Sequence, residues 1–494
     1  MNHAAITVPI LAVFMIATVG LGIAARRGRA SGDMTEWSLG GRSMGLALTL
    51  VLVAGETYTS FSYLGAAGWS YTNGISGLYV VGYLGIGMAI SYLIAPIFWS
   101  YAHRHGLHNI SDIVAHRFDS PWLGALVAIT STVFLLPYIQ LQFTGLGVVV
   151  STVSYGAIGL TASYLIAFVV AECFVLVSGL RGSGWVSVLK DGLVVITLAV
   201  VFVYVPLHFF HGYGPMLHRL VEQKQRWLTL PGPANHALGI GWYMSTVLLN
   251  GVVYSMLPTQ IAAFLGAKNT HTLRRNAMIM PFYQVLLFVP VLLGLGALFV
   301  VPGLKDSNLA LFTMIGKGLP PWFFAVVGAA GALSAIVPTA VFMLVIGTMW
   351  GRSVLGLHRR TAARQKELSQ AVTLIAGVLA LVLTFAYPAA LVRLSLLSYE
   401  GMAQLLPLVL LSLFSRRMSA PAGAAGAAVG IAVVSALVFT HHDPVFGLNA
   451  GLVGLLANLI VVVAITALRP ADAPADRLAQ PESPIEAEPV AQIA

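Results

Sequence analysis

The sequence consists largely of apolar stretches that are each long enough to cross a lipid bilayer. A transmembrane helix needs about 20 mainly apolar residues, and we identify thirteen such stretches between residues 4 and 468. The predicted spans are 4–25, 44–71, 77–101, 121–150, 157–179, 188–210, 238–265, 277–301, 320–349, 370–387, 389–414, 422–439 and 446–468. Backbone groups inside the hydrocarbon core must bond to one another because no water is available there. We therefore predict an all-α polytopic membrane protein with about 13 transmembrane helices.

Charged residues are scarce, and their positions predict the orientation of the chain. Only 9% of the residues are charged and 58% are hydrophobic, whereas a soluble domain carries about 25% charged residues. With the N-terminus outside, the inner segments hold 20 of the 26 basic residues and the outer segments hold five. Basic residues favour the cytoplasmic side, so we predict a multi-pass protein of the bacterial inner (plasma) membrane, with its N-terminus outside and its C-terminus in the cytoplasm. The net charge of +9 then reflects topology, and nucleic acid is not expected as a partner.

The two ends of the chain differ from the region between them. No Lys or Arg precedes the first apolar stretch, so we expect a retained span rather than a cleaved signal peptide. Residues 469–494 are rich in Pro, Ala, Glu and Asp, which predicts a disordered cytoplasmic tail. This tail is too short for a signalling domain, which argues against a sensor. We expect one membrane transporter domain, 1–468, with its core helices at about 44–414.

The second predicted span is interrupted by polar residues near its centre. Gly55 and Glu56 lie there. Five hydroxyl-bearing residues follow closely: Thr57, Tyr58, Thr59, Ser60 and Ser62. An opened helix at this point would free carbonyl groups for a cation and amide groups for an anion. The alternative is a polar helix face that packs through hydroxyl hydrogen bonds, but a buried Glu56 is costly without a function.

A second interruption occurs five spans later. The seventh span contains Asn250 and Gly251, followed by Tyr254 and Pro258. Breaks five helices apart are expected of a five-plus-five inverted repeat in which each repeat begins with a broken helix. The pattern therefore predicts that helices 2 and 7 are both broken and form the transport site.

Two further spans carry polar or helix-breaking residues. In the ninth span, Pro338 precedes Thr339 and would free the carbonyl of Ser334 one turn earlier, although a kink that serves only packing is the alternative. In the fourth span, Gln140 and Thr144 share one helix face. They would either bind a polar solute or bridge neighbouring helices.

Five short motifs follow one another along the chain. They are WSLGGRSMG at 37–45, LGAAG at 64–68, Ile110-Ser111-Asp112 with Arg117-Phe118, Ser178-Gly179-Leu180-Arg181 with Asp191, and Pro258 with Phe264. In order and spacing they resemble the sodium/solute symporter family, which contains sodium-coupled sugar, proline and pantothenate carriers, over about residues 5–468. The stretches 55–59, 137–142 and 337–340 look most like the bacterial monocarboxylate permease branch.

The resemblance implies a fold and an ion site. The fold would be a ten-helix core of the LeuT type, formed by spans two to eleven. The family's sodium ion lies between spans two and nine, and the corresponding positions here are Gly55, Tyr58, Ala335, Pro338 and Thr339. Pro338 stands where the family has a hydroxyl ligand, and a hard cation wants several oxygen ligands. The usual sodium site is therefore incomplete.

This departure leaves two hypotheses for the coupling ion. In the first, which we favour, Glu56 carries a proton and is neutral when the site closes. In the second, Glu56 supplies the missing ligand and the ion is Na+. The coupling cation is therefore H+ or Na+, and no organic cofactor is expected.

The same region predicts the solute. The hydroxyl and amide groups of Thr57, Thr59 and Ser60, completed by Gln140, Asn250 and Tyr254, would form a neutral polar pocket for a monocarboxylate such as lactate or pyruvate. Arg393 is either a counter-ion or a residue that reaches the outer interface. Glu172 and Glu400 are further acids within spans, and each would pair with a polar neighbour or join a proton path. Asp191 follows Lys190 and is expected to be a structural cap or part of a local ion pair rather than a contact of the solute.

Other classes of protein are less consistent with the sequence. A membrane enzyme would need a polar catalytic cluster, and the histidines at 103, 105, 108 and 116 lie in a basic loop. No phosphate-binding loop motif occurs. One cysteine excludes an internal disulfide. We predict a symporter that is not an enzyme and has no obligate protein partner; the alternative within this class is a Na+-coupled carrier of an amino acid, sugar or vitamin.

Overall fold

The structure is a computed structural model that describes residues 3–25, 34–233, 237–356, 361–415 and 417–468. The helices of the main bundle are α1 (Ala4–Ala24), α3 (Leu46–Thr57), α4 (Ala66–Asn73), α5 (Tyr79–Arg104), α7 (Pro121–Val153), α8 (Leu160–Phe210), α10 (Ile240–Tyr254), α11 (Pro258–Gly266), α12 (Thr270–Gln284), α13 (Phe288–Val300), α15 (Pro321–Met349), α16 (Ala362–Ala386), α17 (Leu391–Met402), α19 (Ala420–Phe439) and α20 (Ala450–Ala467). The other α-helices are α2 (Met34–Leu39), α6 (Ile110–Arg117), α9 (Tyr213–Gln223), α14 (Ala310–Gly318) and α18 (Ser412–Phe414). Within the described residues the chain is almost entirely helical, as predicted. The predicted tail, 469–494, lies outside them.

Eleven helical segments of the described chain are long and apolar enough to cross a membrane. The count differs from the predicted 13 because two continuous segments, 61–104 and 160–210, each include parts of two predicted spans. The second has 51 residues, about twice the number that one bilayer requires. It changes direction at Gly179, whose φ of +64° suits a residue without a Cβ.

Both predicted breaks are present. Helix α3 ends at Thr57, and Tyr58 has non-helical angles (φ −87°, ψ 86°) before helical structure resumes in the π-turn η2 (Phe61–Gly65). Helix α10 ends at Tyr254, and Leu257 has a ψ of 138° immediately before α11. Pro258 is the first residue of α11, where its missing N–H leaves no internal hydrogen bond unmade. The prediction that the second and seventh transmembrane helices, at 44–71 and 238–265, are broken is confirmed.

The two broken helices are joined to each other at one end. The Met44 N–H donates to the Gly266 carbonyl at 3.1 Å, and the Lys268 N–H donates to the Met44 carbonyl at 2.9 Å. Met44 lies just before α3, whereas Gly266 ends α11. These bonds fix the register of the two helices at this end.

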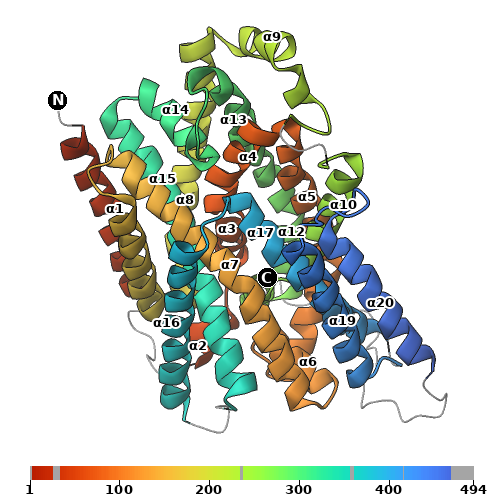
Figure 1. Ribbon diagram of the computed structural model, residues 1–494. Helices are drawn as coiled ribbons and strands as arrows, with labels where there is room; N and C mark the ends of the chain where they lie inside the picture. Colours follow the sequence, from red (N-terminus) through yellow and green to blue (C-terminus); the bar gives the residue numbers. More distant parts are fainter. Residues whose placement is uncertain (1–2, 26–33, 234–236, 357–360, 416, 469–494) are drawn as a thin grey trace, which may run out of the picture.

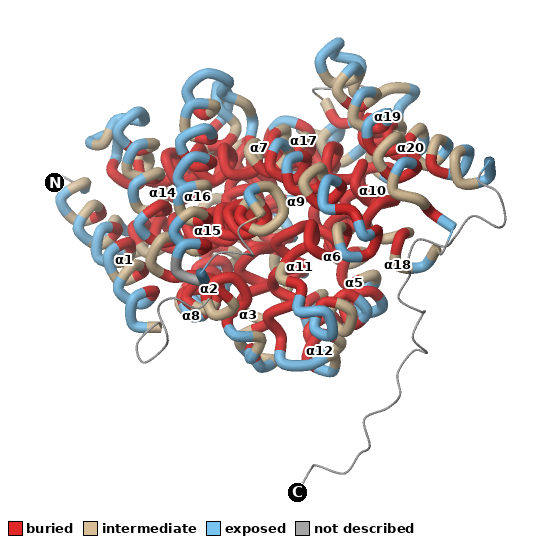
Figure 2. The backbone as a smooth tube through the Cα atoms, turned by 90° about the horizontal axis from the view of Figure 1, so that it is seen from below, coloured by how far each residue is buried: buried red, intermediate tan, exposed pale blue. Residues whose placement is uncertain are grey.

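Helix α15 lies at the centre of the helix bundle. It packs against α7 and α8 and is buried along its whole apolar stretch, whereas only about a third of the corresponding stretches of α16, α19 and α20 is buried. Figure 2 shows the buried segments gathered in the interior and the exposed ones around the rim. Large apolar side chains are exposed on the rim helices, including Ile16, Ile196, Ile375 and Ile460, as expected of a surface that faces lipid.

The two ends of the bundle carry different short helices. Helices α9 and α14, from segments predicted outside, lie at one end, and α2 and α6, from segments predicted inside, lie at the opposite end (Figure 1). Helix α6 is capped at its N-terminus, because the Asn109 side chain accepts from the Asp112 N–H. The structure thus separates the two predicted sides, and which end faces the cytoplasm stays a prediction.

Candidate functional site

A lysine from α8 satisfies the opened backbone at the first break. In a continuous helix the Thr59 N–H would bond the Gly55 carbonyl, but here it bonds the Thr57 carbonyl at 3.2 Å. The Gly55 and Tyr58 carbonyls instead accept hydrogen bonds from Lys190 Nζ, at 2.7 and 2.9 Å. Lys190 is fully buried, although the count of basic residues assigns it to the inner side, at the start of the predicted span 188–210. The two carbonyls that the resemblance assigns to sodium therefore bind an ammonium group.

Two carboxyl groups lie near this ammonium. Asp191 forms an ion pair with Lys190, with 3.1 Å between Oδ1 and Nζ, which confirms the predicted local pairing. Glu56 also interacts electrostatically with Lys190 and is buried. Gln260 of α11 donates from Nε2 to Glu56 Oε2 at 3.3 Å. Glu56 thus connects the first break to the second, while the Lys190 charge is already balanced by Asp191.

The predicted hydroxyl residues line the first break. Thr57 Oγ1 lies 2.8 Å from the Tyr254 hydroxyl, which joins the two breaks a second time. Thr59 Oγ1 accepts from the Phe61 N–H at 3.1 Å. Ser60 is buried, and its hydroxyl has no hydrogen-bond partner among the described residues. The structure therefore brings Thr57 and Tyr254 together as predicted. The Ser60 hydroxyl can still form a hydrogen bond with a ligand.

Asn250 is buried on the same face of α10 as Tyr254, one turn earlier. Neither its amide nitrogen nor its amide oxygen has a hydrogen-bond partner in the described part of the chain. A buried amide without partners costs free energy, and such costs are tolerated where a ligand supplies the missing bonds. Asn250 is the strongest of the predicted solute contacts on this criterion.

The two glutamines of α7 have different positions. Gln140 donates from Nε2 to the carbonyls of Leu383 and Tyr387 at the end of α16, at 3.2 and 2.8 Å. It therefore bridges helices, the alternative that the sequence left open. Gln142 instead lies at the first break, where its Oε1 accepts from the Ser60 N–H at 3.2 Å.

Tyrosines from four helices surround the second break. The ring of Tyr83 lies 6.2 Å from Tyr254 and 5.5 Å from Tyr399. Tyr79 stacks on Tyr83 at 6.0 Å, and Tyr138 meets Tyr399 at 6.2 Å. These side chains surround the break with apolar faces and neutral hydroxyl groups, an arrangement that suits a small solute with one polar end.

The α15 residues predicted at the ion site are all buried. Helix α15 continues through Pro338. The Thr339 hydroxyl donates to the Ala335 carbonyl at 2.6 Å, within its own helix. In this arrangement the Ala335 carbonyl already has a partner, and Pro338 offers no side-chain oxygen.

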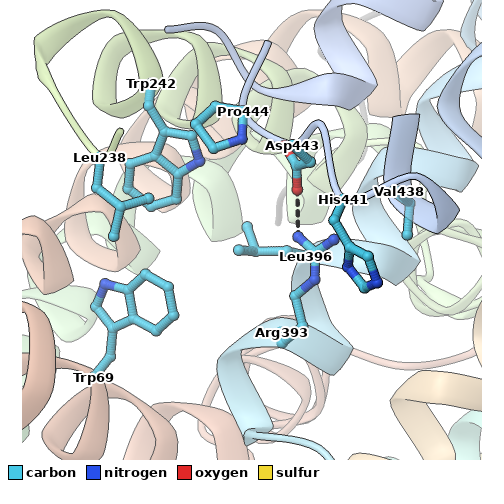
Figure 3. A pocket seen from close by; sticks show the side chains of 9 residues that line it. All are labelled: Trp69, Leu238, Trp242, Arg393, Leu396, Val438, His441, Asp443 and Pro444. Carbon is cyan, nitrogen blue, oxygen red and sulfur yellow. Dashed lines mark hydrogen bonds and ion pairs between the residues drawn. The ribbon is translucent and has the colours of Figure 1, made fainter. Parts of the chain in front are cut away.

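A pocket of about 250 Å³ lies near the N-terminal ends of α10 and α17. Arg393 and Asp443 form an ion pair on one side of it, and Trp69 and Trp242 lie on the other (Figure 3). Trp242 is 6.0 Å from Trp69 and 5.9 Å from Tyr79, measured between ring centroids. Aromatic side chains therefore run without interruption from this pocket to the tyrosines around the second break.

Of the other charged residues singled out in the predicted spans, Arg393 and Glu400 lie together and Glu172 lies apart from them. Arg393 also lies 4.0 Å from Glu400, whose Oε1 accepts from Asn449 Nδ2 at 3.0 Å. Arg393 thus has carboxylate partners within the chain. Glu172 faces Gly377 of α16, away from the breaks, and its carboxyl group has no hydrogen-bond partner among the described residues.

Sequence reasoning missed three residues at the breaks: Lys190, Gln142 and Gln260. Lys190 carried a usable signal, because a lysine within an apolar stretch is costly without a partner. The two glutamines carried none, because their roles depend on which helix faces meet.

Comparisons with known proteins agree with this architecture. The model of the family described as "Sodium:solute symporter family" matches residues 37–431. An uncharacterized symporter of Bacillus subtilis (strain 168), YhjB, is 33% identical over 92% of this chain and 95% of its own length. The monocarboxylate transport permease protein of Rhizobium johnstonii is 26% identical, covering 93% of this chain and 96% of its own.

A solved structure of a Na+-coupled sialic acid symporter, in a substrate-bound outward-open state, has the same fold. Its TM-score is 0.76 at 15% identity, with 94% of this chain and 98% of that chain covered. A nucleobase-cation-symport-1 family transporter superposes with a TM-score of 0.56 at 15% identity, over 91% and 98% of the two chains. The predicted LeuT-type fold is confirmed by these transporters. The chain belongs to the sodium:solute symporter family, and is a multi-pass secondary symporter rather than an enzyme.

Proposed function

We propose that this symporter takes up a small monocarboxylate, of the size of lactate or pyruvate, together with a proton held by Glu56. The observation that carries the proposal is the charge balance at the first break. Lys190 and Asp191 form a buried ion pair, so an ionised Glu56 would leave one uncompensated negative charge. A buried charge without a partner is strongly unfavourable. A proton on Glu56 makes the cluster neutral, so the arriving carboxylate meets no second negative charge there.

The groups at the breaks support a solute with one small polar end. Within the described part of the chain, the buried amide of Asn250 and the hydroxyl of Ser60 have no hydrogen-bond partners, and both can donate to a carboxylate. The hydroxyl groups of Tyr254 and Thr57 meet where α10 and α3 end at the two breaks. The relative named a monocarboxylate transport permease protein matches the chain over nearly its whole length, which supports the same class of solute.

Purified protein in proteoliposomes tests the ion. Uptake of labelled lactate or pyruvate should be driven by a pH gradient, acid outside, and should not respond to a Na+ gradient at constant pH. One proton per anion moves no net charge, so a membrane potential alone should drive no uptake. Uptake driven only by Na+ would contradict the proposal and favour the alternative, a Na+-coupled carrier; a sodium/pantothenate symporter of Escherichia coli is 25% identical to this chain.

Glu56→Gln tests the residue. The amide is neutral at every pH, so proton-driven accumulation should be abolished while exchange of internal for external solute continues. Glu367→Gln is the matched control, because Glu367 is exposed and forms a surface ion pair with Arg364. Wild-type accumulation by Glu56→Gln would show that the proton is carried elsewhere.

Competition identifies the solute. Excess lactate, pyruvate and propionate should each reduce labelled uptake in cells that lack other monocarboxylate carriers. Amino acids, sugars and pantothenate should not. Failure of all three acids to compete would contradict the solute and leave the proton assignment to be decided by the gradients.

A further inference from the structure

Lys190 occupies a position that a transported ion would otherwise take. Its ammonium group donates to the carbonyls of Gly55 and Tyr58 at 2.7 and 2.9 Å. An ammonium has three N–H donors and no acceptor. With Asp191 Oδ1 at 3.1 Å, Nζ has three oxygen atoms around it. Two backbone carbonyls and a carboxylate are the kinds of ligand that a hard cation selects.

We propose that the Lys190 ammonium is a tethered cation that replaces the sodium ion at the first break, so that Lys190 determines which ion this symporter couples to. The inference deepens the proposed function and rests on it for the identity of the coupled ion. The exclusion of Na+ can nevertheless be measured without any solute.

The replacement has a physical basis in charge and space. A sodium ion bound to the Gly55 and Tyr58 carbonyls would lie within a few ångströms of Nζ, and two positive charges in a buried site repel strongly. The carbonyls also have their inward-facing lone pairs engaged by the lysine. The helix break therefore keeps its bonded geometry through a whole transport cycle without an external ion, while Glu56 beside it remains the exchangeable charge.

A purely structural lysine makes a different prediction. If Lys190 only clamps the break, its removal lowers stability and gives no response to Na+. If it stands in for an ion, its removal leaves two carbonyls and the uncompensated Asp191 carboxylate around an empty space. That space then becomes a sodium site.

The test measures Na+ binding to purified protein in detergent, with no solute present. Radioactive sodium binding and the midpoint of thermal unfolding are followed as NaCl replaces choline chloride at constant ionic strength. We expect Lys190→Ala to bind one more Na+ per chain than the wild type and to gain a saturable, Na+-dependent rise in midpoint. Adding Asp191→Asn to Lys190→Ala should remove the gain. Lys317→Ala is the matched control, because Lys317 also bonds a backbone carbonyl, that of Val300, but lies away from the breaks.

Equal Na+ binding by the wild type and Lys190→Ala overturns the proposal. If Lys190→Ala does not fold, Lys190→Ser is measured in the same way. A second comparison keeps Lys190 in place and measures Na+ binding by the wild type and by a variant of the predicted sodium site. Thr339→Ala removes the remaining hydroxyl predicted for the sodium site. Loss of wild-type Na+ binding in Thr339→Ala would show that the site holds sodium beside Lys190 and would overturn the proposal, whereas unchanged binding supports it. None of these results depends on the solute, so they separate this inference from the proposed function.

Discussion

The two helix breaks lie side by side but are stabilised in different ways. At the first, the Gly55 and Tyr58 carbonyls are satisfied by a charged group from another helix, Lys190. At the second, the chain satisfies itself: the Met256 N–H bonds the Val253 carbonyl at 3.0 Å, and Pro258 begins α11. The first break therefore depends on a cation, and the second does not.

This difference suggests a division of labour between the repeats. The first break gathers the charges: Lys190, Asp191 and Glu56. The second provides neutral groups, including the unsatisfied amide of Asn250 and the hydroxyl of Tyr254. We expect substitutions at the first break to change the coupled ion and those at the second to change the affinity for the solute.

The largest effect should come from closing the space beside the first break. A Cβ on Gly55 would lie 2.4 Å from Ser187 Oγ, so Gly55→Ala should push α8 and Lys190 away from the opened carbonyls. Overpacking of this kind costs about 1–3 kcal/mol, and we expect proton-driven uptake in proteoliposomes to fall by up to about 100-fold. Gly85→Ala is the control, because a Cβ there meets open space.

Adding Ser187→Gly to Gly55→Ala shows whether steric crowding causes the loss of uptake. Replacing Ser187 by Gly removes the two closest atoms that the new methyl group meets and leaves Lys190 Nζ at an ordinary contact distance of 3.7 Å. Gly55→Ala combined with Ser187→Gly should therefore recover much of the uptake. No recovery would mean that Gly55 is needed for its backbone freedom and not for the close approach of α8.

At the second break, Asn250→Leu should reduce solute affinity while stability is kept or increased. The buried amide has no partner in the described chain, so its removal relieves a cost of about 1 kcal/mol. We expect the KM for the monocarboxylate to rise about 30-fold at an unchanged Na+ and proton response. Asn458→Leu is the matched control, because that amide donates to the Gln404 carbonyl at 2.7 Å and its loss should lower the unfolding midpoint. A less stable Asn250→Leu protein would argue against a solute contact.

The positions of both breaks could be predicted from the sequence because each depends on local chemistry. Apolar length determines a span, the polar run from Glu56 to Ser62 marks the first break, and Pro258 cannot continue a preceding helix. Gly55 itself stays helical, inside α3. The number of continuous helices was not predicted, because the segment 160–210 remains helical on both sides of Gly179.

The place of Lys190 in an apolar stretch indicates that it has a buried partner, but the sequence does not say which one, because that depends on which face of α8 meets α3. The same reason explains the two glutamines of α7, which are two residues apart. Gln140 points to α16 and Gln142 to the first break, since residues two apart on a helix face different directions.

The bond between the breaks should have a moderate effect. Thr57→Val and Tyr254→Phe each remove one partner of the 2.8 Å hydroxyl contact. Each should raise KM by about 10-fold, since a single buried hydrogen bond contributes about 0.5–1.5 kcal/mol. If the contact couples the two repeats, the double variant should be no worse than either single one. Additive losses would mean that the two hydroxyls bind the solute separately.

The smallest expected effect distinguishes the two glutamines of α7. Gln142→Leu removes the acceptor of the Ser60 N–H at the first break, so uptake should fall about threefold, and the loss of this one bond should lower the unfolding midpoint less than the changes at Gln140 do. Gln140→Leu removes two bonds to the end of α16, so it should lower the unfolding midpoint and leave the KM of the remaining folded protein unchanged. Both are measured on the same preparations by uptake and thermal unfolding. The reverse pattern would place the solute against Gln140 and α16, and would end the assignment of the transport site to the two breaks alone.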